Sequence, residues 1–312
     1  MNQKIGIIID PLDSLHPEKD SSLAMIWEAM NRGYDVIAFY PENIFVKNGV
    51  PSATGILLKK NLKSLIKISE RSLWEGSLKE LDLLLMRKDP PFDMEYIYLT
   101  YFMDALENLG VRCINPGSSL RNVNEKYYIS NFPNCIPPTL ISSSVVQINK
   151  FIAQYKKVVL KPLDGMGGKS IFVINKDDPN RNVILETLLG NKRTIMAQKY
   201  LPEIKDGDKR ILIINGNPID FMLKRIPSKD DFRGNLVRGA KAKIVRIGNE
   251  ERRLCEKIRP HIIKNQLMFV GLDVIGNFIT EINVTSPTGI REIEKAKNIN
   301  ITKILFDEIE SS

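Results

Sequence analysis

The chain has 312 residues, enough for two or three domains, and its hydrophobic (43%) and aromatic (7%) content is that of an ordinary globular protein. A net charge of +8 suits an anionic ligand or reflects only a lysine-rich composition, and no run of five like charges forms a basic tail. Three cysteines, at positions 113, 135 and 255, are too few and odd in number for a disulfide framework and indicate a reducing compartment. Two histidines, His16 and His261, are too few for a histidine-rich metal centre.

The sequence has no segment that predicts a membrane or nucleic-acid partner. No apolar run approaches the ~20 residues that span a bilayer. The apolar stretch at residues 5–9 lacks the length and the cleavage site of a signal peptide. Helix-turn-helix, zinc-finger and clustered basic–aromatic motifs are absent. We therefore expect a cytoplasmic protein with no membrane and no nucleic-acid partner.

The first part of the chain alternates strand and helix patterns. Strands are expected at residues 5–9, 35–40, 82–86 and 111–114, and helices at 21–30 and 95–108. Asp20 precedes the first helix as a capping residue, and Gly33 ends that helix. A βαβ opening predicts a parallel sheet whose ligand crevice lies at the carboxyl ends of the strands. Residues 1–122 are therefore expected to form an N-terminal α/β domain.

Two charged residues fall at that crevice. Asp10 follows the first strand, and Arg87 opens the loop 87–93, which two prolines stiffen directly after a buried strand. Arg87 could bind a carboxylate in bidentate fashion, or the loop could be a solvated turn. Asp10 could contact a ligand or serve only as a structural cap.

The rest of the chain predicts two further units. In residues 123–201 we expect a helix over 122–130 that carries Lys126, a linker at 134–139, a helix at 147–154 and strands at 158–160, 171–174 and 194–201. In residues 202–312 we expect a hairpin of 209–215 with 219–224, a helix at 250–265, a hairpin over 268–282 and a helix at 302–309. The polar stretch 227–243, between the first hairpin and the helix at 250–265, is either a mobile lid or a disordered connector.

A glycine-rich loop separates the strands at 158–160 and 171–174. Gly165, Gly167 and Gly168 allow backbone N–H groups to converge on a phosphate, and Lys161 and Lys169 add cationic donors. A Walker loop would open a helix, whereas a strand follows here. The pattern therefore predicts a hairpin that covers phosphates, and its alternative is an ordinary glycine-rich turn.

The hairpin over 268–282 carries oxygen ligands. Glu281 and Asn283 share one face of a strand because they are two residues apart. A three-residue turn at 276–278 would place Asp273 opposite Glu281, whereas a two-residue turn would point Asp273 to the other face. The three side chains suit Mg²⁺ or Mn²⁺ held together with substrate phosphates. The alternative is three polar residues at a sheet rim.

The glycine-rich loop and the hairpin with its oxygen ligands together resemble those of an ATP-grasp ligase. The ATP-grasp fold has an N-terminal parallel-sheet domain and two α+β domains around the nucleotide. The resemblance narrows to the bacterial glutathione synthetases over essentially the whole chain, because several long segments are similar: MRKDPPFD (86–93), KPLDGMGG (161–168), IKDGDKR (204–210), RGNL (233–236) and TEINVTSPT (280–288). It implies ligation of γ-glutamylcysteine to glycine with ATP and magnesium, through an acyl phosphate, with glutathione, ADP and phosphate as products. It also implies a homo-oligomer, commonly a tetramer.

The resemblance also implies roles for individual residues. It places on the nucleotide Lys126, Lys161, Asp164, Gly165, Met166, Gly167, Gly168, Gln198, Tyr200, Leu201 and Asp208. It assigns the metals to Asp273, Glu281 and Asn283, and the transferring phosphoryl group to Arg210 and Arg225. Arg233 in the lid would help to exclude water, and the dipeptide would contact Arg87, Asp10 and Ser286. Gly239 is followed by Ala240 where the family pattern has a second glycine, so the resemblance does not extend to the hinge of the lid.

Two other functions fit parts of the sequence. Another ATP-grasp ligase would share the nucleotide and metal residues but not the acceptor segments 86–93 and 285–288. A basic nucleic-acid-binding protein would account for the charge, and its binding would weaken steeply with salt.

Overall fold

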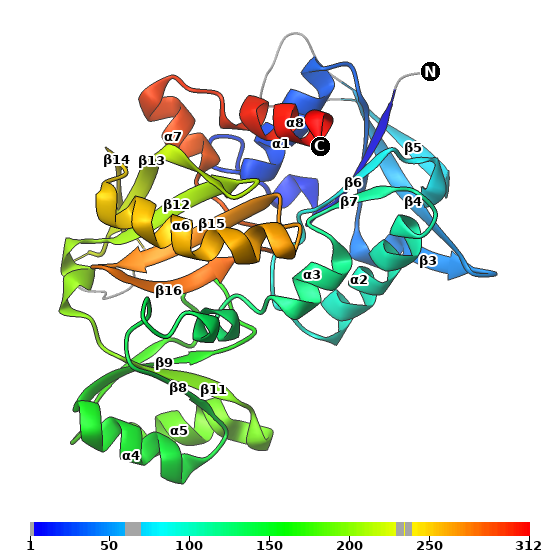
Figure 1. Ribbon diagram of the computed structural model, residues 1–312. Helices are drawn as coiled ribbons and strands as arrows, with labels where there is room; N and C mark the ends of the chain where they lie inside the picture. The colour runs from blue at the N-terminus through cyan, green and yellow to red at the C-terminus, as the bar shows by residue number, and fades with distance from the viewer. Residues whose placement is uncertain (1–2, 60–69, 229–233, 235–238) are drawn as a thin grey trace.

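The computed structural model describes residues 3–59, 70–228, 234 and 239–312. Three β-sheets follow one another along this part of the chain, and in Figure 1 the N-terminal sheet lies on the right, the C-terminal sheet on the left and the middle sheet below the C-terminal sheet. No helix in the described ranges has both the length and the apolar composition needed to cross a membrane.

The N-terminal sheet has the strand order β3-β4-β2-β1-β6-β7, with β5 paired to β4. Its bounds are β1 (Lys4–Ile8), β2 (Asp35–Phe39), β3 (Ile44–Lys47), β4 (Val50–Lys59), β5 (Glu70–Ser77), β6 (Leu83–Met86) and β7 (Arg112–Ile114). The expected parallel strands are confirmed as β1, β2, β6 and β7. The antiparallel extension β3–β5 was not anticipated.

Helices flank this sheet: α1 (Ser21–Asn31), α2 (Met94–Glu107), α3 (Gly117–Asn122), and the 3₁₀ turns η1 (Leu12–Ser14), η2 (Pro41–Asn43) and η3 (Leu78–Glu80). The capping role expected for Asp20 is confirmed, because its carboxylate accepts from Ser22 N at 2.7 Å and from Leu23 N at 3.1 Å. Asp93 caps α2 in the same way through Tyr96 N, at 3.0 Å.

The middle sheet is antiparallel, with the order β10-β9-β11-β8. Its elements are η4 (Tyr127–Asn131), β8 (Thr139–Ser142), α4 (Val145–Tyr155), β9 (Lys157–Pro162), β10 (Phe172–Asn175), α5 (Arg181–Leu189), η5 (Gly190–Lys192) and β11 (Ile195–Lys199). Side chains alternate along β9, so Val158 and Leu160 pack with α4 and α5 in a small core of their own, whereas Val159 and Lys161 point to the opposite face and line a cavity.

The C-terminal sheet is also antiparallel, with the order β14-β13-β12-β15-β16. Its elements are η6 (Pro202–Asp206), β12 (Asp208–Ile214), β13 (Asn217–Ile226), β14 (Lys241–Arg246), α6 (Asn249–Lys264), β15 (Phe269–Ile275), β16 (Phe278–Asn283), α7 (Ile290–Lys297) and α8 (Ile301–Ser311). Ile211 and Ile213 of β12 pack with α6. On the other face of β12, Leu212 and Ile214 pack with α7 and α8, and Arg210 is left to line the same cavity as Lys161.

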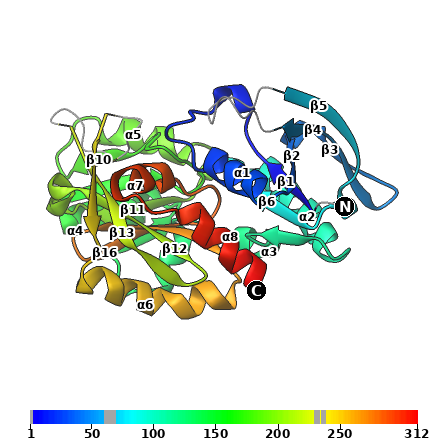
Figure 2. The same cartoon turned by 90° about the horizontal axis from the view of Figure 1, so that it is seen from above.

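The N-terminal and C-terminal sheets share a hydrophobic core. One buried cluster joins Ile7 of β1 and Met25 of α1 to Leu212 of β12 and Phe306 of α8. Figures 1 and 2 both show α8 lying beside α1, and Arg32 after α1 pairs with Asp307 and Glu310 of α8 at 2.6 Å each. The chain's end is therefore packed against its beginning.

Some expected elements differ. The helix expected over 122–130 is wrong: α3 ends at Asn122 and only η4 follows, because Asn124 Oδ1 accepts from Lys126 N and Tyr127 N and so forms an Asx turn in place of a helix start. The stretch 227–243 is not loop throughout, because residues 241–243 lie in β14. Strand β8 and helices α5 and α7 were missed.

Candidate active site

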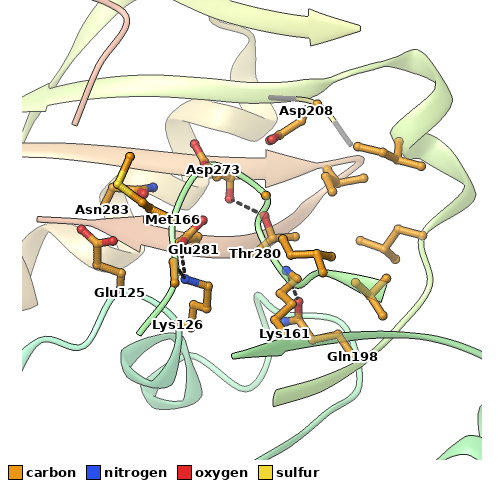
Figure 3. A pocket seen from close by; sticks show the side chains of 18 of the residues that line it. Glu125, Lys126, Lys161, Met166, Gln198, Asp208, Asp273, Thr280, Glu281 and Asn283 are labelled. Carbon is orange, nitrogen blue, oxygen red and sulfur yellow. Dashed lines mark hydrogen bonds and ion pairs between the residues drawn. The ribbon is translucent and has the colours of Figure 1, made fainter. Parts of the chain in front are cut away.

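A cavity separates the glycine-rich loop of the middle sheet from the β15–β16 hairpin of the C-terminal sheet (Figure 3). Gly167 and Glu281, far apart in sequence, both line it. Its empty volume, which includes open solvent at the mouth, is about 1030 Å³. The lining side chains that carry charge are Glu125, Lys126, Lys161, Lys169, Lys199, Asp208, Arg210, Asp273 and Glu281.

The glycine-rich loop has the form expected of a hairpin cover. Phe172 of β10 pairs with Leu160 of β9 across it, so a strand and not a helix follows the glycines. Gly167 and Gly168 have φ values of +63° and +72°, which L side chains rarely adopt. Gly165, Met166, Gly167 and Gly168 all line the cavity, so their backbone is available to a ligand there.

The β15–β16 hairpin has the two-residue turn that was expected to point Asp273 to the other face, yet Asp273 lies opposite Glu281. Gly276 and Asn277 form a two-residue turn, since Ile275 pairs with Phe278 and Val274 with Ile279. A β-bulge then shifts the register, and Glu281 instead of Thr280 pairs with Asp273. Thr280 and Glu281 consequently both line the cavity, with Asp273 and Asn283, while Ile279 and Ile282 stay in the core.

Two lysines reach the cavity, the buried Lys126 from the start of η4 and the half-buried Lys161 from β9. Lys126 Nζ donates to Gly165 O at 2.6 Å and pairs with Glu281 Oε1 at 2.9 Å, so it joins the glycine-rich loop to the hairpin (Figure 3). Burial alone would lower the pKa of Lys126, but Glu281 and Glu125 outweigh it and raise that pKa. Lys161 Nζ donates to Gln198 Oε1 at 2.8 Å, and burial lowers the pKa of Lys161.

Two arginines neutralise the carboxylates of the C-terminal sheet. Arg210 binds both carboxylate oxygens of Asp273, at 2.5 and 2.8 Å. Arg225 pairs with Asp273 at 3.0 Å and with Asp208 at 2.5 Å. Burial acts to raise the pKa of Asp273, but the two guanidinium groups hold it well below its usual range. Burial raises the pKa of Asp208 to about 6 against the opposing charge of Arg225.

Most residues predicted to bind the nucleotide line the cavity, but Asp164 does not. Gln198, Tyr200, Leu201 and Asp208 line the cavity. Asp164 does not line it, because its exposed carboxylate pairs with Arg193 at 2.7 Å. Arg225 also lies behind the lining, and Arg233 is outside the described residues.

The three predicted dipeptide contacts form a separate cluster near the carboxyl ends of β1 and β6. The buried Arg87 donates to Ser22 Oγ and to Pro287 O, each at 3.0 Å. Asp10 pairs with Lys88 at 2.8 Å and accepts from Asp89 N at 2.8 Å. The Ser286 hydroxyl bonds the Asp89 carboxyl, whose pKa burial raises.

Sequence reasoning missed Glu125 and Thr280. Glu125 is buried, lines the cavity and lies beside Lys126 and Glu281. Its position next to Lys126 was the one available signal, and nothing local separates it from a surface glutamate. Thr280 lies in the TEINVTSPT segment, but its exposure to the cavity depends on the bulge.

Comparisons with known proteins cover nearly the whole chain. The model of the prokaryotic glutathione synthetase N-terminal domain matches residues 3–121, and that of the prokaryotic glutathione synthetase ATP-grasp domain matches residues 125–298. Glutathione synthetase of Pseudomonas aeruginosa is 43% identical over 317 residues, covering 99% of this chain and 98% of the relative. That of Vibrio cholerae is 44% identical over 311 residues, covering 98% and 97%.

Solved structures of low identity share the architecture. A D-cycloserine synthetase, DcsG, has a TM-score of 0.68 at 12% identity and covers 96% of this chain and 99% of its own. The ATP-grasp ligase PsnB, complexed with a minimal precursor, has a TM-score of 0.66 at 14% identity and covers 100% of both chains. At such identities the likeness concerns the ATP-grasp fold alone.

Proposed function

This chain belongs to the prokaryotic glutathione synthetase family and is an ATP-dependent, ADP-forming ligase that makes glutathione, and we propose that the cavity between the glycine-rich loop and the β15–β16 hairpin is its active site. Its substrates are ATP, γ-glutamylcysteine and glycine. The observation that carries the proposal is that Gly167 and Glu281 line one cavity, so amide donors and oxygen ligands face the same space.

ATP would lie with its phosphates under residues 165–168. Lys126 and Lys161 reach the cavity from below the loop and would contact those phosphates. Gln198, Tyr200 and Leu201 would border the adenine and Asp208 the ribose, since all four line the cavity. Asp164 is not among the lining residues and pairs with Arg193, so for Asp164 we propose a structural role in place of a nucleotide contact.

A divalent cation, Mg²⁺ or Mn²⁺, would be held by Asp273, Glu281 and Asn283. Among the described residues, no group of three His, Cys, Asp or Glu side chains is placed to hold a metal ion. The proposed ligands are instead two carboxylates and one amide. This all-oxygen set fits a hard cation that takes its remaining ligands from phosphate and water. When bound, such an ion neutralises charge on the phosphoryl group that is transferred.

The reaction we propose has two displacements. The cysteinyl carboxylate of the dipeptide attacks the γ-phosphorus, the bond from phosphorus to the β,γ-bridging oxygen breaks, and ADP leaves. The amine of glycine then attacks the acyl carbon, the C–O bond to phosphate breaks, and the nitrogen loses a proton as the amide forms. Arg210 lines the cavity and would stabilise the phosphoryl oxygens, while Arg225 would act through Asp208 and Asp273.

The dipeptide would bind beside the cluster of Arg87, Asp10 and Ser286. Arg87 uses Nε and one terminal nitrogen on Ser22 and Pro287, which leaves guanidinium donors for a carboxylate. Arg233, which the structure does not describe, stays proposed as a lid residue that limits hydrolysis of the acyl phosphate.

Glu281→Gln tests the metal proposal. Asp273 is the poorer choice, because it neutralises two buried arginines and its loss would destabilise the fold. The glutamine can still accept from Lys126 but is a weaker metal ligand. We expect the Mn²⁺ affinity of the ADP complex, measured by electron paramagnetic resonance, to fall at least about tenfold, and ligation to fall with it.

The matched control is Asp220→Asn on β13, which removes an exposed carboxylate paired with Arg252 and should leave both measurements unchanged. Undiminished Mn²⁺ affinity in the Glu281 variant would remove the metal assignment. A panel of amino acids in a phosphate-release assay tests the amine, and preference for another amine would overturn glycine.

We further propose three domains, 1–122, 123–201 and 202–312, because each sheet is formed within one of these ranges. The tetramer and the cytoplasmic location that the resemblance and the cysteine content implied remain proposals. The cysteines are free and buried. Light scattering after size exclusion would test the tetramer.

A further inference from the structure

The loop 284–288 connects the nucleotide cavity to the Arg87 cluster. It leaves β16 directly after Asn283 and is held by buried side chains at both ends. Asn115 Nδ2 donates to Val284 O at 2.9 Å, and Arg87 donates to Pro287 O at 3.0 Å. The position of this loop therefore sets where Ser286 stands relative to the cavity.

Glu125 makes the densest set of contacts with that loop. Its Oε1 accepts from Val284 N at 2.8 Å, from Thr285 N at 3.0 Å and from Thr285 Oγ1 at 2.8 Å. Its backbone oxygen accepts from Ile282 N at 2.9 Å. Glu125, Val284 and Thr285 are all buried, so no solvent replaces these bonds when they are lost.

The two neighbours of Glu125 hold the glycine-rich loop. Asn124 Nδ2 donates to Leu163 O at 3.2 Å, and Lys126 Nζ donates to Gly165 O at 2.6 Å. Three consecutive residues thus fix the phosphate-covering loop on one side and the acceptor-side loop on the other. Figure 3 shows Glu125 at the end of the cavity nearest Asn283, the residue from which the 284–288 loop leaves β16.

We propose that Glu125 is a positioning residue for the acceptor: through the 284–288 loop it places the dipeptide-binding residues relative to the phosphates that Lys126 contacts. This inference rests on the proposed function, because it takes Arg87 and Ser286 as dipeptide contacts. In placing this loop, Glu125 acts by the reach of its acceptor oxygen and not by its charge.

Reach and charge are separated by two conservative variants. Glu125→Gln keeps an acceptor oxygen at the same distance and removes the charge. Glu125→Asp keeps the charge and withdraws the carboxylate by one methylene, so it cannot reach all three donors. Losing such bonds to buried donors is worth about tenfold or more in affinity.

We expect Glu125→Asp to raise KM for γ-glutamylcysteine at least about tenfold and Glu125→Gln to leave it within about threefold of the parent. The Kd of each variant for Mg-ATP, measured by calorimetry without dipeptide, should change by less than about threefold. Thr285→Val, which removes only the hydroxyl donor, should give a smaller rise than Glu125→Asp. Thermal unfolding midpoints identify any variant that is merely unstable.

The reverse order, with Glu125→Gln impaired and Glu125→Asp intact, would overturn the proposal in favour of an electrostatic role. Equal losses for dipeptide and nucleotide would overturn it as well. Arg87→Ala separates this inference from the function on which it rests. If Arg87→Ala raises KM for the dipeptide and Glu125→Asp does not, the result supports the acceptor site and contradicts the proposed role of Glu125. If Arg87→Ala has no effect, the acceptor assignment itself is wrong.

Discussion

At the scale of single residues, the two lysines of the cavity are paired with other lining residues, whereas Asp208 Oδ1 is buried without a hydrogen-bond partner among the described residues. Lys161 donates a hydrogen bond to Gln198, which in turn donates to Thr139 Oγ1 at 3.1 Å. Lys126 forms an ion pair with Glu281. Such pairing satisfies charges that burial would otherwise penalise. It also means that a ligand phosphate competes with these partners for the lysines.

Gln198 tests this competition. Gln198→Glu would place a carboxylate beside Lys161, so we expect weaker ATP binding, by roughly 1–2 kcal/mol, because the phosphate must displace an ion pair. Gln198→Leu instead leaves the ammonium without its acceptor and should lower the free energy of unfolding by about 1–3 kcal/mol. Calorimetry with Mg-ATP and urea denaturation measure the two effects, and the prediction fails if the glutamate variant binds ATP more tightly.

Asp164 tests the corrected assignment. Its pair with Arg193 is exposed, and exposed pairs contribute about 0–1 kcal/mol. Asp164→Ala should therefore change KM for ATP by less than about threefold and stability by less than about 1 kcal/mol. A large rise in KM for ATP in steady-state assays would restore Asp164 to the nucleotide site.

At the scale of elements, the β-bulge at Thr280 explains how the hairpin works. A regular ladder from the two-residue turn would pair Glu281 with Leu272, whose side chain is in the core. The bulge absorbs one residue, so the carboxylate reaches the cavity without a longer turn. Alternation accounts for the two faces of β9 and β12 in the structure, but a bulge breaks alternation and has no local signature here beyond a single threonine.

Helix α6 begins with half of a capping box that depends on pH. Glu251 Oε2 accepts from Gly248 N at 2.9 Å, and its Oε1 accepts from Lys209 Nζ at 2.6 Å. Burial opposes ionisation, but the Lys209 bond and charge lower the pKa of Glu251 below its usual value. A lowered folded pKa stabilises the fold above the unfolded pKa of about 4.3, and this contribution is lost as pH falls through the folded pKa.

We therefore expect Glu251→Gln to reduce the free energy of unfolding at pH 7 by roughly 0.5–1.5 kcal/mol, the net value of one such hydrogen bond. The difference between variant and parent should shrink below about pH 4. Urea denaturation between pH 3 and pH 8 measures it. A difference that stays constant across this range would show that the charge of Glu251 contributes nothing.

At the scale of the whole molecule, the two outer sheets and the middle sheet differ in how they are supported. The N-terminal and C-terminal sheets share a core through α1 and α8, whereas the face of the middle sheet under α4 and α5 has a smaller core of its own. The middle sheet carries the glycine-rich loop. The ligand cavity therefore lies between a large unit and a smaller one.

Hydrogen exchange should show this difference. We expect amides of β9, β10 and α5 to exchange at a lower opening free energy than those of β12 and β15, because fewer buried contacts hold them. Mg-ATP should slow exchange in β9 and β10 more than in α8, which is remote from the cavity. Equal protection in the two units without ligand would contradict this account.

The sequence by itself determined the parts of this protein that are local. Strand and helix patterns, the capping by Asp20, the glycine-rich hairpin and the shared face of Glu281 and Asn283 follow from residue type and spacing over a few positions. The family could be predicted as well, because long motifs such as KPLDGMGG carry it.

Only the tertiary structure decided the rest. Whether Gly167 and Glu281 share a cavity, and that Glu125 holds residues 284 and 285, depend on segments that meet across more than a hundred positions. The pairing of Asp164 with Arg193 also joins separate elements, although they are only 29 positions apart. Such contacts form because a buried polar group requires a partner, and residue type alone does not say which distant segment supplies it.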